Sequence, residues 1–295
     1  MSENKNLLAW VMLIGLALIW GSSFILIKRG LDIYSASEVG ALRIASASVF
    51  LLPFAIRGLR KVKARHWKLL FFVGLFGSLL PAFLFAKAQT QLPSSVAGIL
   101  NALTPLFTML IGILFFSQNI NLKTTIGLLV GLAGTIFLII AGSGGAISDL
   151  NYYGLYVILA TIFYGANLNL IKYHISDLTA RTITSISLLI VGPVSLIYLL
   201  LGTNFIDKTI NTDGAWFAFS AVVLLGVLGT AIALIIFNQL VKLTSPIFTS
   251  SVTYIIPIIA VGWGLLDNEQ LFIGHYFGMG LIILGVYLSR NRAKS

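Results

Sequence analysis

Long apolar segments recur along the whole chain and are separated by short polar connections. Windows long enough to cross about 30 Å of hydrocarbon fall at 7–28, 35–56, 68–90, 93–116, 123–142, 152–171, 180–202, 215–238, 246–265 and 272–289. The apolar residues in these windows are continuous and do not alternate with polar ones, which favours helices over the strands of a membrane barrel. The pattern predicts an all-α integral membrane protein with ten transmembrane helices.

The polar interruptions of the first windows recur in the later ones. The segment LIWGSSFILIKRG at 18–30 has the shape of IFYGANLNLIKYH at 162–174, with Trp20 in the place of Tyr164. Five helices in each half is an odd number, so the halves would insert in opposite orientations, as in many secondary transporters. We predict two inverted-topology five-helix repeats, 7–142 and 152–290, joined by an outer linker at 143–151.

The composition excludes a soluble domain. Hydrophobic residues make up 58% of the chain and charged residues 9%, whereas soluble domains carry about 25% charged residues. The net charge of +10 does not indicate nucleic-acid binding, because the basic residues lie between apolar windows and form no helix face interleaved with aromatic residues. We expect the lipid bilayer, and no nucleic acid, as a partner.

The basic residues predict the orientation. With a cytoplasmic N-terminus, the inner side holds Lys5, Arg57, Arg60, Lys61, Lys63, Arg65, Lys68, Lys123, Lys172, Arg181, Lys242, Arg290, Arg292 and Lys294. The outer side then holds only Lys28, Arg29, Lys87 and Lys208. Positive charge gathers on the cytoplasmic side of membrane proteins. We therefore predict a multi-pass protein of the inner (plasma) membrane with both termini in the cytoplasm.

Polar and aromatic residues at membrane depth in the first and sixth helices are candidates for a substrate cavity. Trp20, Ser23, Tyr164 and Asn167 offer flat aromatic faces and hydrogen-bonding groups there. Asn169 cannot share a helix face with Asn167, so at most one of them lines a cavity. The neighbouring glycines have an alternative interpretation, since small residues also allow close helix packing in lipid.

Two prolines near the centres of the fourth and ninth helices extend this candidate set. Pro105 and Pro257 remove the hydrogen bonds to the carbonyls of Asn101 and Thr253, and backbone groups released at this depth need a partner or a water-filled cavity. We expect both helices to line the path, with Tyr254 close by. The alternative is a plain kink whose carbonyls bond to a neighbouring helix.

Arg43 lies about eight residues into the second window. An arginine at this depth is costly and normally faces a cavity or a partner. It could attract an anionic substrate group or pair with a carboxylate, or its side chain could reach up to the interface.

Other chemistries find no support in the sequence. There is no GxxxxGK[ST] motif for ATP hydrolysis, no cysteine, and the three histidines are scattered in or near loops. No Asp or Glu lies in the middle of a window, so paired-aspartate proteolysis and coupling through a central carboxylate lack a basis. We predict no enzyme activity, no metal and no cofactor.

Three stretches of the sequence carry a family pattern, namely WGSSFILIK, the stretch from LLGVLGTAIALIIFNQLVK to GLIILGVYL, and a weaker counterpart from Leu69 to Leu138. In these stretches the sequence resembles the EamA-type transporters of the drug/metabolite transporter superfamily. It covers nearly the whole chain. The acidic residue before the last helix of each unit is present as Glu269 but is replaced by Gln118 in the first half, which removes any charge-dependent role there. The resemblance implies a ten-helix bundle, alternating access and a central cavity for small organic substrates.

The sequence thus predicts a secondary transporter, an exporter of small amphiphilic metabolites such as amino acids. The alternatives are a nucleotide-sugar or drug carrier and a membrane protein that uses the same bundle without transport. A sugar-nucleotide carrier should hold several basic residues in its cavity for the phosphates, and only Arg43 qualifies. Substrate identity, direction, coupling and oligomeric state are left open by the sequence.

Overall fold

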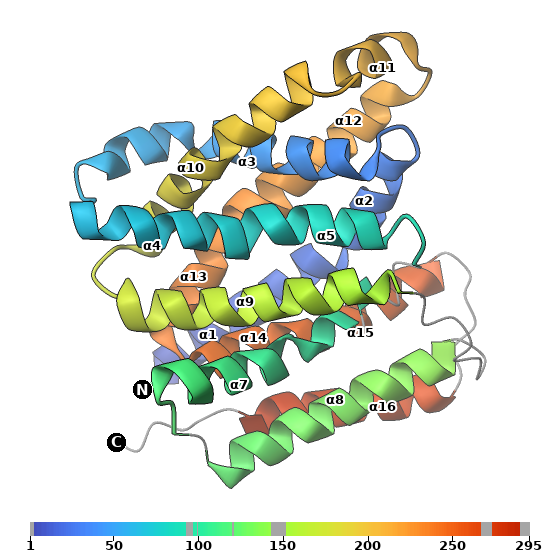
Figure 1. Ribbon diagram of the computed structural model, residues 1–295. Coiled ribbons are helices and arrows are strands. Elements are labelled where there is room, and N and C mark those ends of the chain that lie inside the picture. Colours follow the sequence, from blue (N-terminus) through green and yellow to red (C-terminus); the bar gives the residue numbers. More distant parts are fainter. Residues whose placement is uncertain are drawn as a thin grey trace.

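The chain folds into a bundle of helices (Figure 1). A computed structural model describes residues 3–92, 97–98, 100–119, 121–142, 152–266 and 273–289, and within these ranges no strand occurs. The helices are α1 Glu3–Gly21, α2 Ser23–Leu31, α3 Ala36–Leu59, α4 Ala64–Gly74, α5 Leu80–Ala88, α7 Thr104–Phe116, α8 Leu122–Gly142, α9 Gly154–His174, α10 Ala180–Leu201, α11 Phe205–Asn211, α12 Ala215–Leu224, α13 Ala233–Leu243, α14 Pro246–Ser250, α15 Val252–Leu266 and α16 Ile273–Ser289. The predicted linker 143–151 and Glu269 lie outside the described residues.

Six helical segments are long and apolar enough to cross a membrane, namely Asn6–Leu31, Ala36–Leu59, Ala64–Ala88, Gly154–His174, Ala180–Leu201 and Ala215–Leu243. Three shorter apolar helical segments, Asn101–Phe116, Leu122–Gly134 and Pro246–Ile259, lie in other predicted windows, and α16 lies in the last one. An all-α membrane fold is therefore confirmed. The count of ten spans and the inverted relation of the halves stay predictions.

The structure differs from the predicted windows mainly at helix ends. The third predicted membrane helix (α4 and α5) begins at Ala64 and not at 68, and the eighth (α12 and α13) continues to Leu243 and not to 238. Basic and polar residues at these ends lower the local hydrophobicity of the sequence. Their long apolar side-chain stems can lie against the apolar surface, so the helix extends beyond the predicted window. The loop expected at 203–214 contains the short helix α11, whose Lys208 pairs with the buried carboxylate of Glu38 at 2.7 Å.

Several of the predicted membrane helices contain local breaks in their α-helical geometry. The hydroxyl groups of Ser22 and Ser23 donate to the carbonyls of Leu18 and Ile19, both at 2.9 Å, at the junction of α1 and α2. Such back-bonding bends a helix. Between α4 and α5, and again between α12 and α13, the chain forms π-helical turns over Leu75–Leu79 and Leu225–Ile232. A 3-10 turn over Asn101–Leu103 precedes α7.

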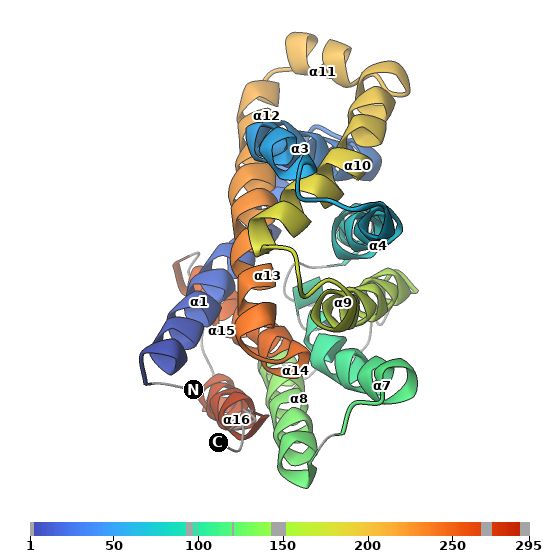
Figure 2. The same ribbon diagram turned by 90° about the vertical axis from the view of Figure 1, so that its left-hand side faces the viewer.

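The helices pack in pairs that join distant parts of the sequence. In both ribbon views α8 runs beside α16, and α3 packs on α10 (Figures 1 and 2). Around the middle of the bundle α1 packs on α13 and α15, while α9 packs on α5 and α7. Segments from the two halves of the chain therefore contact each other throughout the bundle.

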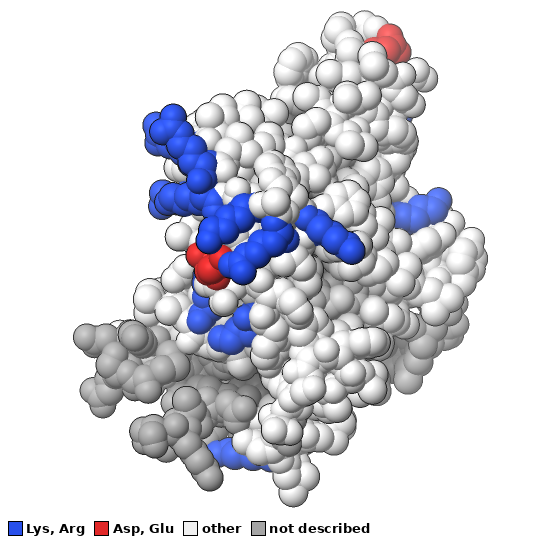
Figure 3. All heavy atoms as spheres, turned by 60° about the vertical axis from the view of Figure 1, so that its left-hand side comes forward, with Lys and Arg blue, Asp and Glu red and all other residues white. Residues whose placement is uncertain are grey.

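Apolar side chains cover much of the outer surface, as lipid contact requires. Leu114, Phe115 and Leu122 are 72%, 75% and 75% exposed. Basic side chains gather instead on one face (Figure 3). The connection from α3 to α4 exposes Lys61 and Lys63, and the first turn of α4 exposes Arg65. Arg65 binds Asp177 at 2.6 Å, and this hydrogen bond holds the pKa of Asp177 below its usual range.

Candidate functional site

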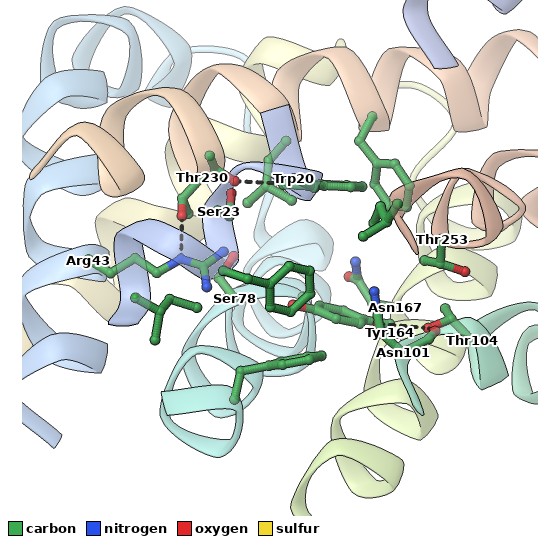
Figure 4. A pocket seen from close by; sticks show the side chains of 18 residues that line it. Trp20, Ser23, Arg43, Ser78, Asn101, Thr104, Tyr164, Asn167, Thr230 and Thr253 are labelled. Carbon is green, nitrogen blue, oxygen red and sulfur yellow. Dashed lines mark hydrogen bonds between the residues drawn. The ribbon is translucent and has the colours of Figure 1, made fainter. Parts of the chain in front are cut away.

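A cavity of about 790 Å³, counted out to its open mouth, lies in the middle of the bundle (Figure 4). The cavity is lined by Trp20, Ser23, Phe24, Ile27, Arg43, Gly77, Ser78, Phe85, Asn101, Thr104, Tyr164, Asn167, Gly229, Thr230, Leu234, Phe237, Thr253 and Ile256. No Asp or Glu is among these lining residues.

The structure brings seven of the ten candidate residues together around this cavity, namely Trp20, Ser23, Arg43, Asn101, Tyr164, Asn167 and Thr253. The other three do not line it. Tyr254 points to α8, where its hydroxyl donates to the Leu128 carbonyl at 3.1 Å. Pro105 stands at the second position of α7 and Pro257 inside α15. A substrate-binding role for the seven stays a prediction.

Trp20 is fixed by contacts with the opposite half of the chain. Its indole Nε1 donates to the Gly229 carbonyl at 2.8 Å, within the second π-helical turn. Its ring meets Phe237 edge-on, with 4.9 Å between the centroids. One tryptophan face is thus held in place at the cavity wall.

Tyr164 stands in the middle of the cavity, on α9. Its ring stacks on Phe85 with 6.2 Å between centroids, and Phe85 in turn meets Phe24 edge-on at 6.3 Å. These rings give the cavity a largely aromatic wall. Flat apolar substrate groups would stack well against it.

One end of the cavity carries neutral polar side chains. Asn101, Thr104, Asn167 and Thr253 lie there together (Figure 4). The carbonyl of Asn101 is not free, contrary to the sequence-based expectation, because the Thr104 hydroxyl donates to it at 2.7 Å. The same hydroxyl lies 3.2 Å from the Asn101 side-chain oxygen. Pro105 therefore releases a carbonyl that the threonine three residues along the chain satisfies, and Asn101 offers its side chain to a ligand.

Arg43 occupies the other end of the cavity (Figure 4). Its Nε donates to the Thr230 hydroxyl at 2.7 Å, so the guanidinium turns into the bundle and does not reach up to the interface. Gly226 makes this placement possible, since a Cβ at that position would lie 2.6 Å from the Arg43 carbonyl. The backbone of α3 is therefore pressed against the second π-helical turn.

The sequence did not predict that the third and eighth membrane helices line the cavity. Gly77, Ser78 and Phe85 come from one, and Gly229, Thr230, Leu234 and Phe237 from the other. A signal was present in the sequence, since Gly77 and Gly229 correspond when the halves are aligned with a shift of 152. Their π-helical geometry, which often marks functional sites, could not be read from residue types.

On the side where the basic residues gather, reciprocal lysine contacts join the ends of α9 and α13. Lys172, at the end of α9, donates to the carbonyls of Val241 at 3.2 Å and Thr244 at 2.5 Å. Lys242, at the end of α13, donates in return to the carbonyls of Ser176 and Leu178. Beneath this reciprocal contact lies the largest apolar core, which includes Leu13, Leu16, Leu168 and Leu240.

No metal centre is formed by the described residues, where no three of His, Cys, Asp or Glu gather at one place. The groups around the cavity are aromatic, amide, hydroxyl and guanidinium groups. They can bind and orient a small amphiphile.

A multi-pass helical bundle around an internal cavity is an architecture that many membrane transport proteins share. The chain belongs to the EamA-like transporter family, which matches residues 7–140 and 152–291. The resemblance seen in the sequence is thereby confirmed.

Several relatives support this assignment. The "Uncharacterized inner membrane transporter YedA" of Escherichia coli strain K12 is 29% identical over 285 residues, which cover 94% of this chain and 88% of that protein. An "Uncharacterized transporter" of Archaeoglobus fulgidus is 22% identical and covers 95% and 97% of the two chains. A "Probable terminal-alkyne amino-acid exporter" of Streptantibioticus cattleyicolor is 27% identical over 124 residues, 42% of each chain. The protein is therefore a multi-pass membrane transporter.

A solved crystal structure has the same fold. It matches with a TM-score of 0.72 at 18% sequence identity and covers 97% of this chain and 99% of that chain. At this identity the likeness shows the fold alone.

Proposed function

We propose that the protein is a secondary transporter that exports small amphiphilic metabolites, such as amino acids, by alternating access around the central cavity. The observation that carries the proposal is the cavity itself, which combines an aromatic wall with polar groups at both ends. The groups that form it come from both halves of the chain, so a movement of one half against the other would open it to either side.

The helix contacts support an inverted repeat. In the predicted alignment α1 corresponds to α9, α13 to α5 and α15 to α7. α1 packs on α13 and α15, and α9 packs on α5 and α7. Each contact therefore has a counterpart with the halves exchanged, as a twofold relation requires.

Two close glycine–side chain contacts at the cavity show the same correspondence between the halves. A Cβ on Gly77 would lie 2.6 Å from the Asn167 side chain, and a Cβ on Gly229 would lie 2.9 Å from the Ser23 side chain. Ser23 and Asn167 correspond with a shift of 144, and the two glycines with a shift of 152. This agreement at the level of single residues supports two equivalent gates around one site.

The state of the bundle fits one conformation of such a cycle. The contact between the ends of α9 and α13 closes the basic side, which we propose to be cytoplasmic from the distribution of Lys and Arg. Substrate would enter from the cytoplasm after these lysine bonds break. We propose that the protein carries out no covalent chemistry, since no paired carboxylates or nucleophile and base line the cavity.

The charges in the cavity favour some substrate classes over others. Arg43 is the only basic residue among the lining residues, which disfavours nucleotide sugars because two phosphates need several cations. Drugs without a polar group would leave the asparagines and Arg43 unpaired at a cost. Amphiphilic metabolites satisfy both parts of the cavity.

The test is a substrate screen in proteoliposomes, with and without an imposed pH gradient. Replacing Asn101 or Tyr164 by alanine should weaken transport of an identified substrate about five- to thirtyfold, since one lost hydrogen bond of 1 to 2 kcal/mol has that effect. Folding of each variant is checked by its thermal transition. Substitution of the exposed Lys123 by alanine is the control and should leave transport unchanged. Unaltered transport by Asn101→Ala and Tyr164→Ala would show that these residues only pack.

A further inference from the structure

Arg43 places a positive charge in the cavity that no acidic side chain balances. Within the described ranges its guanidinium takes part in no ion pair, and its one hydrogen bond to another side chain goes to the neutral Thr230. Glu38 lies one to two turns earlier on α3 and forms an ion pair with Lys208 at 2.7 Å. A charge in this environment is costly until a counter-charge arrives.

The groups around Arg43 cannot neutralise it. Thr230 accepts the Nε hydrogen bond, and the Ser23 hydroxyl donates to the Ile19 carbonyl. The terminal nitrogens of the guanidinium therefore stay available on the cavity side (Figure 4). Two parallel N–H groups match the oxygens of a carboxylate or a phosphate, and a singly charged carboxylate fits better here because Arg43 is the only Lys or Arg among the lining residues.

A second unpaired group lies at the far end of the cavity. Asn167 is only 2% exposed, and its side-chain oxygen has no hydrogen-bond partner. Asn101 lies at the same end of the cavity, and because its oxygen lies next to the Thr104 hydroxyl, its NH₂ group is the part left for a ligand (Figure 4).

The two ends require different ligand chemistry. Arg43 calls for an anion, whereas the asparagines call for a neutral group that both donates and accepts, such as a hydroxyl or an amide. Trp20 and Tyr164 lie between the two ends and favour a flat apolar body (Figure 4). An ammonium group finds no carboxylate among the lining residues at either end.

We propose that the transported substrate is a monoanion, an aromatic or similarly flat carboxylate whose acid group binds Arg43 and whose distal polar group binds Asn101 and Asn167. This inference rests on the proposed transport function and narrows its substrate class. It ranks a carboxylate without an ammonium group above the zwitterionic amino acid of the same skeleton, because the ammonium of the latter would lie beside the Arg43 charge without an acidic partner.

The test compares four ligands that share one ring and differ in charge. These are 3-(4-hydroxyphenyl)propanoate, its amide, tyrosine and tyramine, whose binding to the full-length purified protein is measured by calorimetry at neutral pH. The acid should bind at least about tenfold more tightly than the amide, since hydrogen bonds between charged partners are about twice as strong as neutral ones. Tyrosine should follow, and tyramine should bind most weakly. This comparison uses the wild-type protein and needs no variant.

Variants then assign the effect to Arg43. Arg43→Gln should bring the affinities for acid and amide within about twofold of each other, and Arg43→Lys should keep most of the preference. Lys87→Gln, a basic residue outside the cavity, should leave the preference unchanged. A melting curve checks each variant for folding, and if Arg43→Gln does not fold, Arg43→Lys and the wild-type comparison carry the test.

In proteoliposomes, uptake of the acid should respond to an imposed membrane potential, rising when the interior is positive, while uptake of the amide should not. Equal or tighter binding of the amide, tyrosine or tyramine by the wild-type protein would overturn the monoanion inference, as would binding of none of the four. Transport of some other small molecule in the same vesicles would then leave the proposed function standing. If no small molecule is transported, the proposed function itself fails.

Discussion

At the residue scale, the glycines in the two corresponding motifs serve helix packing. A Cβ on Gly165 would lie 2.8 Å from the Thr108 backbone nitrogen and 2.9 Å from the Phe107 carbonyl carbon. A Cβ on Gly21 would lie 2.7 Å from the side chain of Ile259. The small residues let α9 approach α7, and α1 approach α15, and the polar neighbours of these glycines are thereby brought to the cavity.

This contact predicts that Gly165→Ala destabilises the protein. The atoms in the way belong to the backbone of α7, which cannot rotate aside as a side chain can, so α7 and α9 must separate. Overpacking of this kind costs about 1 to 3 kcal/mol, more than the helix propensity that alanine gains, which is at most about 1 kcal/mol. Thermal unfolding in detergent should show a lower transition temperature.

The control is Gly15→Ala, a helical glycine of α1 around whose Cβ position nothing lies within 4 Å. Its transition temperature should stay the same or rise slightly. Equal behaviour of the two variants would contradict the packing interpretation of Gly165.

At the element scale, the two π-helical turns determine which side chains reach the cavity. They lie at corresponding positions of the third and eighth membrane helices. Each contains a glycine that lies close to a side chain from the other half of the chain. A π-helical turn interrupts the regular backbone ladder, and the Gly229 carbonyl accepts its hydrogen bond from Trp20. An unbroken α-helix would give each carbonyl an intrahelical partner.

The reciprocal lysine contact between α9 and α13 predicts how the closed side opens. Lys172→Met removes the donor to the carbonyls of Val241 and Thr244. A loss of about 1 kcal/mol from the closed state should raise the population of the open state roughly fivefold.

A single cysteine at Leu234 would report this change, because Leu234 lines the cavity and the chain has no native cysteine. In the Lys172→Met background it should react faster with an impermeant thiol reagent applied from the side of Lys61. Lys123→Met serves as the matched control, since Lys123 is exposed. An unchanged labelling rate in Lys172→Met would argue that this contact is no part of a gate.

At the scale of the whole molecule, the charge distribution predicts the orientation. Lys61 is exposed on the connection between α3 and α4, and Asp213 is exposed on the connection between α11 and α12. If the basic face is cytoplasmic, single cysteines at these positions should label from opposite sides of the membrane, Lys61→Cys from the inside and Asp213→Cys from the outside. Labelling of both from one side would rule out an odd number of spans between them.

The sequence by itself determined the all-α membrane class and seven of the residues that line the cavity. Continuous apolar windows leave no choice but helices in a bilayer, because every backbone group there must bond within its own segment. Arg43 stood out because a charge at membrane depth is costly unless it has a role, and Trp20 and Tyr164 because their N–H and O–H groups need hydrogen-bond partners when buried. Such signals are local, and a sequence displays them directly.

Only the tertiary structure decided which candidates meet. It turned Tyr254 toward Leu128, satisfied the Asn101 carbonyl with Thr104, and added Gly77 and Gly229 to the cavity. It also left Arg43 without an acidic partner among the described residues. These outcomes depend on the rotation of each helix about its axis and on breaks in the helical ladder. Apart from the local Asn101–Thr104 bond, these features are fixed by packing between segments that lie far apart in the chain, which local residue patterns do not encode.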